Sequence, residues 1–272
     1  MSKYASPEEY GLADLLCCAA SREVQDNEIV FAGTGLPMVA IMLAQKTHAP
    51  NLKLIFEAGT LDGRPPELPT SVGDARCETG ASRSSGLYDA FSIAQRGYVD
   101  LGYLGGAEID QYGNVNTTCI GNYLEPELRL TGSGGNPDIN SFARRTVFIM
   151  VHEKRRFVEH VSYITSPGWR VKKWPGGEWV HRRELYGAAF RGGPSAVIST
   201  AGVFRFDEND GHMYLDTCHP GKTPAEIKEL CQFDLDVSRV KGETAPPTTD
   251  ELHFIHDVLD PSQIFIPKVK KA

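Results

Sequence analysis

Leu52-Lys53-Leu54-Ile55-Phe56-Glu57-Ala58-Gly59-Thr60 is the stretch from which the rest of this sequence can be interpreted. A short apolar run, rich in strand-forming residues and bounded by Asn51 and Gly59, indicates a buried strand of an α/β sheet. The run ends in a single carboxylate, and open α/β sheets bind their ligands at the carboxyl ends of the strands. Glu57 is therefore the first candidate for a catalytic residue. The alternative is an ordinary strand-end Glu that faces solvent.

The residues before this strand complete a β-α-β unit. The sequence predicts a strand over 28–33, a tight turn over 33–37 and an apolar helix over 38–45. A strand, a helix and a second strand imply a parallel pair with a right-handed crossover. The turn contains Gly33-x-Gly35, but a dinucleotide fingerprint needs a third Gly where this chain has Met38. We therefore interpret it as a backbone-lined turn near Glu57, and a nicotinamide-dependent enzyme is not indicated.

Further elements follow from capping and periodicity. A capping box at Ser6-Pro7-Glu8-Glu9 predicts a helix that runs to about Arg22. Residues 62–85 are rich in Pro, Gly and Ser without periodicity, and we interpret them as one long functional loop. The next predicted elements are a helix over 87–96, a strand over 99–106, a turn and short strand over 107–116, a helix over 138–144 and a strand over 146–151.

The C-terminal half is predicted to be antiparallel. Residues 165–194, with three Trp and many Gly, indicate a surface loop and a candidate partner contact. The runs 196–200, 203–206 and 212–216 indicate a meander. Capping boxes at Thr223 and Thr248 predict a short helix and a final helix to about Leu259. We predict one domain over residues 1–272, an open mainly parallel sheet flanked by helices, with this antiparallel extension.

Composition limits the classes of function. The chain has 272 residues, of which 41% are hydrophobic and 23% charged, as in soluble globular proteins. A formal net charge of −7 and the lack of a basic stripe argue against nucleic-acid binding. No apolar run reaches the roughly 18 residues of a membrane span, and no apolar signal core follows Met1. We expect a cytoplasmic protein that does not contact a membrane.

The cysteines and histidines indicate neither a disulfide frame nor a metal. Cys77 and the five other cysteines form no C-x-x-C pair, which favours reduced thiols. Cys77 has no His nearby in the sequence, so we interpret it as structural. The eight His form no metal-binding motif. We expect no metal and no permanently bound cofactor.

A second Gly-rich segment, Thr131-Gly132-Ser133-Gly134-Gly135-Asn136, precedes a predicted helix. Consecutive backbone N–H groups without side chains can form an anion-binding nest at such a position. The alternative is a plain flexible turn.

Taken together, these segments resemble the β subunits of class I coenzyme A transferases, most closely those of the glutaconate CoA-transferase type. The similarity covers nearly the whole chain in the same order. It is carried by residues 33–37, 57–59, 71–74, 105–116, 131–135, 152–157, 165–169 and 233–237.

The resemblance implies a nucleophilic carboxylate. In that family the Glu of an E-S-G or E-N-G motif attacks, and Glu57 matches it, although Ala58 replaces the Ser or Asn. A carboxylate that attacks an acyl-CoA thioester gives a mixed anhydride and CoA thiolate, and the thiolate then forms a glutamyl-CoA thioester. An acceptor carboxylate reverses these steps, so covalent catalysis divides one hard exchange into easier ones.

The resemblance also implies an oxyanion site and a partner. Each step passes through an oxyanion that needs aimed N–H donors, and the family's Gly-rich loop corresponds to Gly134 and Gly135. We place Gly33 and Gly35 with them as backbone of the CoA site. The family's active site lies between α and β subunits, so an α subunit is implied, with acyl-CoA and a carboxylic acid as substrates. We expect this chain to be inactive alone.

Three arginines after Glu57 are candidates for a substrate carboxylate: Arg64, Arg76 and Arg83. The alternative for each is a solvated loop side chain. Asn114 and Asn116 are predicted to cap turns instead of contacting substrate.

Two other functions stay open. Some relatives of this fold are hydrolases or decarboxylases that act on CoA thioesters, and they have replaced the β-chain Glu. Glu57 is present here, which favours a transferase, although water could also attack a glutamyl-CoA. A non-catalytic partner chain is the second alternative, and the presence of both Glu57 and the Gly-rich loop argues against it.

Overall fold

The computed structural model describes residues 3–173, 175–187 and 191–269. The chain divides into two compact units: residues 1–103 with 245–272, and residues 104–244. The expectation of a single domain over residues 1–272 stays a prediction.

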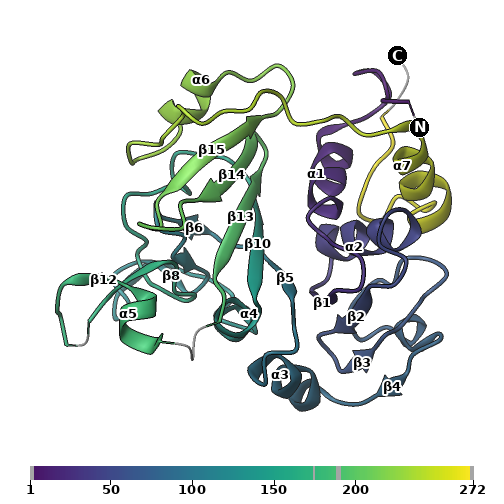
Figure 1. Ribbon diagram of the computed structural model, residues 1–272, viewed down its shortest axis with the longest axis horizontal. Helices are drawn as coiled ribbons and strands as arrows, with labels where there is room; N and C mark the ends of the chain where they lie inside the picture. The colour runs from purple at the N-terminus through teal and green to yellow at the C-terminus, as the bar shows by residue number, and fades with distance from the viewer. Residues whose placement is uncertain (1–2, 174, 188–190, 270–272) are drawn as a thin grey trace. The chain divides into compact units, whose positions relative to one another are not determined.

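The first unit carries the strands β5-β1-β2-β3-β4, side by side in that order (Figure 1). Helix α1 packs against α2, and α2 packs against the π-helical turn η3. The bounds are α1 (Leu12–Ser21), β1 (Ile29–Ala32), α2 (Leu36–Lys46), β2 (Lys53–Phe56), β3 (Thr60–Leu61), the 3₁₀ turn η1 (Ala75–Glu78), β4 (Arg83–Ser84), α3 (Leu87–Gln95), β5 (Leu101–Leu104, whose last residue opens the second unit), α7 (Thr249–His253) and η3 (Phe254–Leu259).

The β1-α2-β2 unit is confirmed. β1 and β2 pair in parallel from Ile29↔Lys53 to Ala32↔Phe56, and β5 joins the other side of β1, also in parallel. Residues 38–45 of α2 are all buried, because a helix that is apolar on every side belongs inside the fold. This packing places the carboxyl end of β2, and with it Glu57, at the edge where α/β sheets bind ligands.

The interpretation of residues 62–85 as one long loop was wrong in part. The chain reverses at Gly59, so that β3 pairs antiparallel with β2, and β4 then pairs antiparallel with β3. The turn η1 lies between them. Two-residue strands are too short to show periodicity, and only their pairing with β2 makes them part of the sheet.

The predicted start of the first helix was also wrong. The Ser6 N–H does donate to the Glu9 carboxylate at 2.7 Å, but the contact closes only a turn. The chain before it is held extended, because the Ala5 N–H donates to the Pro247 carbonyl. The helix begins at Leu12, where Asp14 accepts from the Gly11 N–H at 2.8 Å.

The second unit carries β10-β13-β14-β15 side by side (Figure 1). β10 and β13 are parallel, whereas β13-β14-β15 form the predicted antiparallel meander. The bounds are β6 (Glu108–Ile109), β7 (Val115–Asn116), β8 (Cys119–Gly121), β9 (Pro126–Arg129), α4 (Asn136–Phe142), β10 (Arg145–Met150), β11 (Arg170–Lys172), β12 (Trp179–His181), α5 (Arg182–Tyr186), β13 (Pro194–Ser199), β14 (Gly202–Phe206), β15 (Met213–Cys218) and α6 (Pro224–Glu229).

Residues 165–194 are more ordered than the predicted surface loop. They contain the β11–β12 hairpin and α5. Trp169 is only partly exposed, and its indole N–H donates to the Pro194 carbonyl at 2.8 Å. A Cβ on Gly168 would lie 2.1 Å from the Tyr112 carbonyl oxygen, so the chain packs closely here. Trp174 and residues 188–190 of this predicted loop lie outside the described residues.

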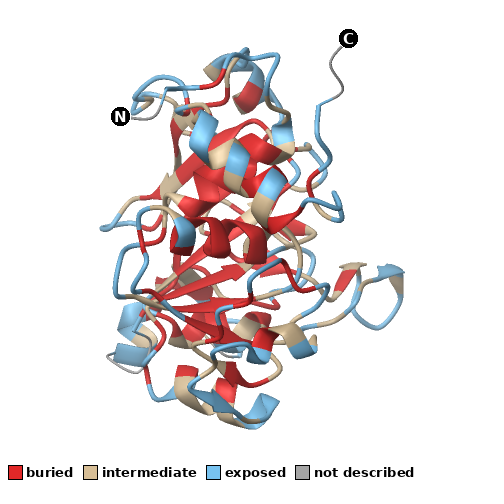
Figure 2. Ribbon diagram, turned by 90° about the vertical axis from the view of Figure 1, so that its right-hand side faces the viewer, coloured by how far each residue is buried: buried red, intermediate tan, exposed pale blue. Residues whose placement is uncertain are grey.

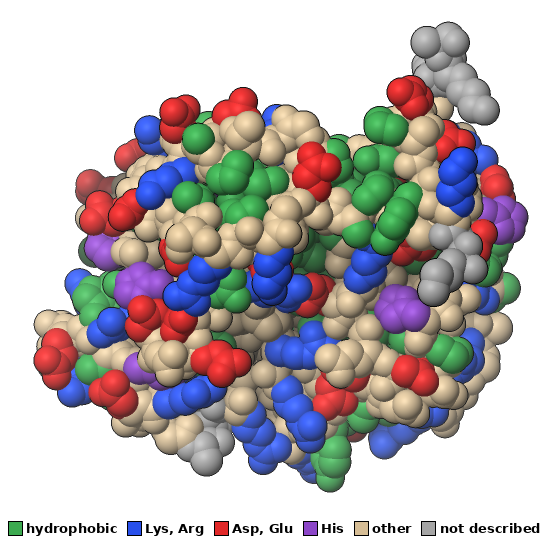
Figure 3. Space-filling model, turned by 45° about the horizontal axis from the view of Figure 1, so that its top comes forward, with side chains coloured by type: hydrophobic (Ala, Val, Ile, Leu, Met, Phe, Trp, Pro, Cys, Tyr) green, Lys and Arg blue, Asp and Glu red, His purple; other side chains and the backbone are tan. Residues whose placement is uncertain are grey.

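The predicted fold class is confirmed: parallel central strands, flanking helices and an antiparallel extension. Buried residues concentrate in the strands and in the helix faces that pack on them (Figure 2). On the face that Figure 3 shows, cationic and anionic side chains are interspersed. Among the described residues, no helix has both the length and the apolar character that crossing a bilayer requires.

Candidate active site

Glu57 directly follows β2 and lies in a turn. The side chain is half-buried. Within the part of the chain that the structure describes, its carboxylate has no hydrogen-bond or ion-pair partner. Burial raises the pKa of Glu57 above the ordinary value for Glu, because a desolvated carboxylate is costly to ionise. The alternative of a fully solvent-facing Glu therefore does not describe this residue.

The turn that holds Glu57 is fixed by its backbone. The Gly59 N–H donates to the Phe56 carbonyl at 2.9 Å, which closes the turn around Glu57 and Ala58. The Ser85 hydroxyl donates to the Gly59 carbonyl at 2.6 Å. Gly59 has φ +116°, and a Cβ there would lie 2.6 Å from the backbone of Ser85. Only Gly fits this position, and it sets the direction in which Glu57 leaves the strand.

Two further loops of the first unit lie beside this turn. A Cβ on Gly73 would lie 3.9 Å from the Cβ of Ala58, which puts residues 71–74 in contact with the turn. The Val72 N–H donates to the Thr34 hydroxyl at 3.3 Å and connects that loop to residues 33–37. Gly35 has φ +97° and caps α2. The structure thus brings together Glu57, Gly35 and the neighbouring Gly33, as segments of one edge of the unit.

The three candidate arginines each have a partner within their own unit. Arg76 makes a forked ion pair with Asp74, with Nε–Oδ1 at 3.1 Å and Nη2–Oδ2 at 2.6 Å. Hydrogen bonds from Arg76 hold the pKa of Asp74 well below its usual range. Arg64 donates to the Pro50 carbonyl at 3.1 Å, and Arg83 lies 3.6 Å from Asp89. A role of these arginines in substrate binding stays a prediction.

Cys77 is poorly suited to be a nucleophile. The thiol is buried, and burial raises its pKa to about 11, so it is protonated at neutral pH. All six cysteines lie within the described ranges and are free.

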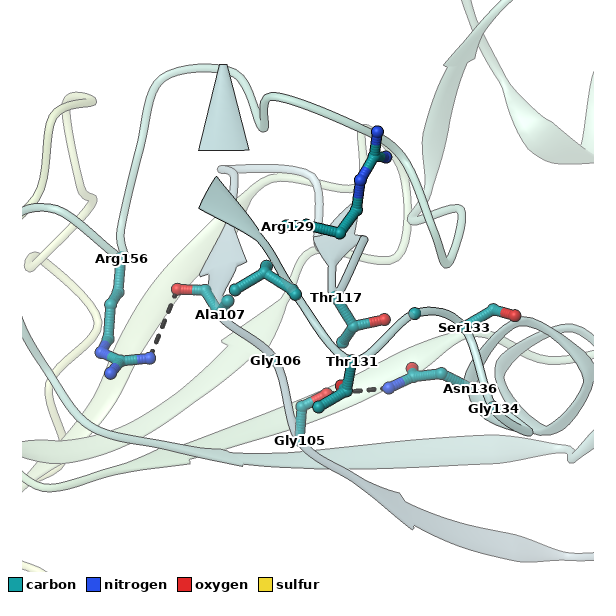
Figure 4. A pocket seen from close by; sticks show the side chains of 12 residues that line it. Gly105, Gly106, Ala107, Thr117, Arg129, Thr131, Ser133, Gly134, Asn136 and Arg156 are labelled. Carbon is teal, nitrogen blue, oxygen red and sulfur yellow. Dashed lines mark hydrogen bonds between the residues drawn. The ribbon is translucent and has the colours of Figure 1, made fainter. Parts of the chain in front are cut away.

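The second unit contains a pocket of about 820 Å³ between its two glycine-rich segments (Figure 4). Gly105-Gly106-Ala107 forms one wall, and residues 130–134 form the opposite part of the lining. We call this the Gly-loop pocket. It is lined by Gly105, Gly106, Ala107, Thr117, Arg129, Leu130, Thr131, Gly132, Ser133, Gly134, Asn136 and Arg156.

The Gly-rich segment is an ordered turn. Gly132 and Gly134 have φ +96° and +50°, and a Cβ at either position would meet nothing within 4 Å. Gly135 caps α4, and the next residue, Asn136, donates to the Gly105 carbonyl at 2.9 Å. Asn136 in turn accepts from the Ser166 hydroxyl at 2.8 Å. Asn136 therefore connects the two glycine-rich walls of the pocket, as Figure 4 shows.

Sequence reasoning missed two charged residues of this pocket. Arg129 ends β9 and Arg156 precedes the buried Phe157, and both line the pocket. Arg156 lies within residues 152–157, one of the stretches that carry the family resemblance. That resemblance could have indicated Arg156 as a site residue. Nothing in the sequence near Arg129 marks it as a pocket residue.

Asn114 and Asn116 hold turns, as predicted. Both are buried. The Asn114 side chain donates to Asp110 at 2.8 Å and accepts from the Gly168 N–H at 2.7 Å. The Asn116 amide donates to Glu108 at 2.7 Å and accepts from the Thr118 N–H at 2.9 Å. In residues 3–173, 175–187 and 191–269, no three His, Cys, Asp or Glu side chains group as metal ligands would.

A family model described as coenzyme A transferase matches residues 16–230. The B subunit of glutaconate CoA-transferase from Acidaminococcus fermentans is 36% identical over 264 residues, which cover 94% of this chain and 95% of that protein. The B subunit of 3-oxoadipate CoA-transferase from Pseudomonas knackmussii is 33% identical over 247 residues, which cover 90% of this chain and 92% of that protein.

Solved structures share the fold. The crystal structure of glutaconate CoA-transferase from Acidaminococcus fermentans matches with a TM-score of 0.85 at 32% identity, over 99% of this chain and 100% of that chain. The crystal structure of the decarboxylase AibA/AibB matches with a TM-score of 0.78 at 26% identity, over 94% of this chain and 97% of that chain. The fold alone therefore does not choose between a transferase and a decarboxylase.

Proposed function

This chain belongs to the coenzyme A transferase family, and from that membership we propose that it moves CoA between an acyl-CoA and a small carboxylic or dicarboxylic acid. It would do so as the β-type subunit of a complex with an α subunit of the same family. The two relatives described above are B subunits, and their names contain glutaconate and 3-oxoadipate, both dicarboxylic acids.

The observation that carries this proposal is the state of Glu57. A carboxylate at the end of a strand, half-buried and without a partner in the described part of the chain, is unusual, because buried carboxylates are normally paired. Burial raises the pKa of Glu57, and a more basic carboxylate is a stronger nucleophile than that of an ordinary Glu. A decarboxylase or a non-catalytic subunit has no evident use for a carboxylate kept in this way.

The chemistry requires only a nucleophile and oxyanion donors. A Glu57 oxygen attacks the thioester carbonyl and the carbon–sulfur bond breaks. The products are a mixed anhydride on Glu57 and free CoA thiolate. The thiolate then attacks the Glu57 carbonyl carbon, and the anhydride releases the donor acid as a carboxylate. The resulting glutamyl-CoA thioester reacts with the acceptor carboxylate through the same two steps in reverse order.

Each addition places negative charge on a carbonyl oxygen, which backbone donors would stabilise. We assign this task to N–H groups of Gly134 and Gly135, with Gly33 and Gly35 as further backbone of the CoA site. In acyl-transfer enzymes, removing one oxyanion donor costs about 2.7–4 kcal/mol. CoA enters as a substrate, and the proposed reaction needs neither a metal nor a bound cofactor.

The test is to trap the covalent intermediate. The chain is co-purified with its partner subunit and incubated with glutaconyl-CoA or 3-oxoadipyl-CoA without acceptor acid. Trypsin should release residues 54–76, because the Arg64–Pro65 bond resists cleavage, and mass spectrometry then locates a CoA adduct on Glu57. Adding acceptor acid should remove the adduct and produce the new acyl-CoA.

Glu57→Gln should lower turnover by about 10³-fold or more, since the nucleophile is lost. Glu67→Gln is the matched control, because Glu67 is exposed and belongs to the same unit. Thioester consumption that survives Glu57→Gln, without any adduct in the wild type, would reject the transferase and favour the hydrolase or decarboxylase alternative.

A further inference from the structure

We infer that Arg156 and Arg129 recognise an oxyanion-bearing group of the substrate in the Gly-loop pocket, which is either the second carboxylate of a dicarboxylic acid or a phosphate of coenzyme A. The identity of these ligands rests on the proposed function. The recognition itself rests on the charge and the geometry of the pocket.

The pocket is cationic in an acidic protein. The chain has 28 Lys and Arg against 35 Asp and Glu, yet the charged side chains among the described residues that line the pocket are both arginines. The remaining lining is mostly glycine backbone and hydroxyls, which do not offset that charge. Arginine binds carboxylate and phosphate through a rigid fork of donors, so this lining suits an anion.

Arg156 is held in place before any ligand arrives. The Ile109 N–H donates to its carbonyl at 2.7 Å, which ties its backbone to the start of the β6–β7 hairpin. Its Nε donates to Glu153 at 3.1 Å, and its Nη1 lies 3.5 Å from the Ala107 carbonyl, as Figure 4 shows for the latter contact. A guanidinium that is already positioned loses little freedom when it binds an anion.

Glu153 does not cancel the positive charge. Its carboxylate also accepts from Arg155 at 2.7 Å, so one anion is shared between two guanidinium groups. The two arginines differ in location. The side chain of Arg155 is 76% exposed and does not line the Gly-loop pocket, whereas that of Arg156 is 28% exposed and does. Arg155 is therefore the matched control for Arg156.

Contacts within the β8–β9 hairpin hold Arg129 in position. Its guanidinium lies 5.0 Å from the centroid of the Tyr123 ring and donates to the Tyr123 carbonyl at 3.0 Å. The following backbone is also fixed, because the Leu130 N–H donates to Thr118 and the Gly132 N–H donates to Thr117. Arg129 is more exposed than Arg156, so we expect a smaller contribution from it.

The test measures binding without turnover, by isothermal titration calorimetry on the purified complex of this chain with its partner subunit. Four ligands form two pairs: coenzyme A with pantetheine, which lacks the phosphates, and glutarate with butyrate, which lacks the second carboxylate. The variants are Arg156→Gln, Arg129→Gln and the control Arg155→Gln, each with a melting curve to show that it is folded.

Arg156→Gln should weaken the binding of one anionic ligand by about 10- to 100-fold, and Arg129→Gln by several-fold, as expected for charged hydrogen bonds. Arg155→Gln should stay within about twofold of the wild type, as exposed charges do. Weaker binding of coenzyme A but not of pantetheine would identify a phosphate as the group that the arginines bind. Weaker binding of glutarate but not of butyrate would identify the second carboxylate as that group.

The inference is overturned if Arg156→Gln binds coenzyme A and glutarate as tightly as the wild type does. It is also overturned if Arg155→Gln weakens the binding of these anions as much as Arg156→Gln does, or if Arg156→Gln weakens the binding of pantetheine and butyrate to the same extent. Should Arg156→Gln not fold, Arg156→Lys keeps the charge without the fork, and wild-type affinity of that variant for both anions would reject the proposal. The calorimetry measures binding and needs no turnover. If the trapping experiment found no adduct on Glu57, the transferase would be rejected, but the binding result for Arg156 could still be interpreted.

Discussion

At the scale of the residue, Glu57, which we propose as the nucleophile, is kept at a cost in stability. Partial burial without a compensating donor disfavours its ionised form, and burial is the cause that raises its pKa. By contrast, hydrogen bonds from Arg76 and Thr70 satisfy Asp74, a short distance along the chain, and lower its pKa. A carboxylate is thus satisfied by its neighbours at Asp74, whereas burial disfavours the ionised form at Glu57, where we propose that it reacts.

We predict that Glu57→Gln raises the melting temperature at pH 7–8 by about 1–2 °C. The folded pKa of Glu57 lies above the unfolded one, so the folded state binds the proton more tightly. Stability therefore falls as pH rises from the unfolded pKa through the folded pKa, and the loss persists at higher pH. Because Gln carries no charge, the Glu57→Gln variant does not lose stability in this way as the pH rises.

Scanning calorimetry at several pH values checks this prediction. The gain of Glu57→Gln should disappear at acidic pH, where the wild-type carboxyl is protonated in both states. Glu67→Gln, at an exposed position, should change the melting temperature little at any pH. A destabilised Glu57→Gln variant at pH 7–8 would show that the carboxylate has a stabilising partner.

At the scale of the element, the turn between β2 and β3 determines where Glu57 is presented. Its hydrogen bonds come from its own backbone and from Ser85, which lies in a segment 26 residues later in the chain. The capping box at Thr223 illustrates the opposite, purely local case: its hydroxyl accepts from the Glu226 N–H and starts α6 where the sequence predicted. Turns closed by distant segments are the ones that sequence patterns do not reveal.

Gly59→Ala should destabilise the first unit by about 2–4 kcal/mol. The added Cβ meets the backbone of Ser85 at 2.6 Å, and an L residue at φ +116° is strained as well. Urea unfolding measures the loss. Gly86→Ala is the control, since a Cβ there meets nothing within 4 Å, and should cost less than about 1 kcal/mol. Equal costs for the two variants would show that the turn tolerates a side chain.

At the scale of the whole molecule, the chain exposes apolar side chains that a partner could cover. Around the β8–β9 hairpin, Leu124 is 83% exposed, Leu128 55% and Tyr123 51%. Tyr123 stacks on Tyr163, with ring centroids 5.2 Å apart. Large apolar and aromatic groups on a surface are typical of protein–protein contacts. This agrees with the proposal that the chain works as one subunit of a complex.

We predict that the chain expressed alone has no CoA-transferase turnover, and that co-expression with its α subunit gives a hetero-oligomer with turnover. Light scattering coupled to size-exclusion chromatography measures the mass, and formation of the new acyl-CoA measures the activity. Turnover by the chain alone, at a rate equal to that of the complex, would contradict the prediction. An inactive but stable hetero-oligomer would instead favour the non-catalytic alternative.

The sequence by itself determined those features that depend on neighbouring residues. Apolar runs and caps determined β1-α2-β2, the antiparallel meander and the starts of α6 and α7, and short motifs along the chain, taken together, indicated the family. These features are local, because burial periodicity and capping act over a few residues.

The tertiary structure alone decided the features that depend on distant contacts. β3 and β4 exist because they pair with β2 and with each other, and the first helix starts late because Ala5 is bound to Pro247. The placement of Arg156 was likewise not local, because its guanidinium lies beside the carbonyl of Ala107, which is 49 residues earlier in the chain, in the Gly-loop pocket. Pairing energies between residues far apart in the chain leave no periodic trace in sequence, which is why only the folded chain shows them.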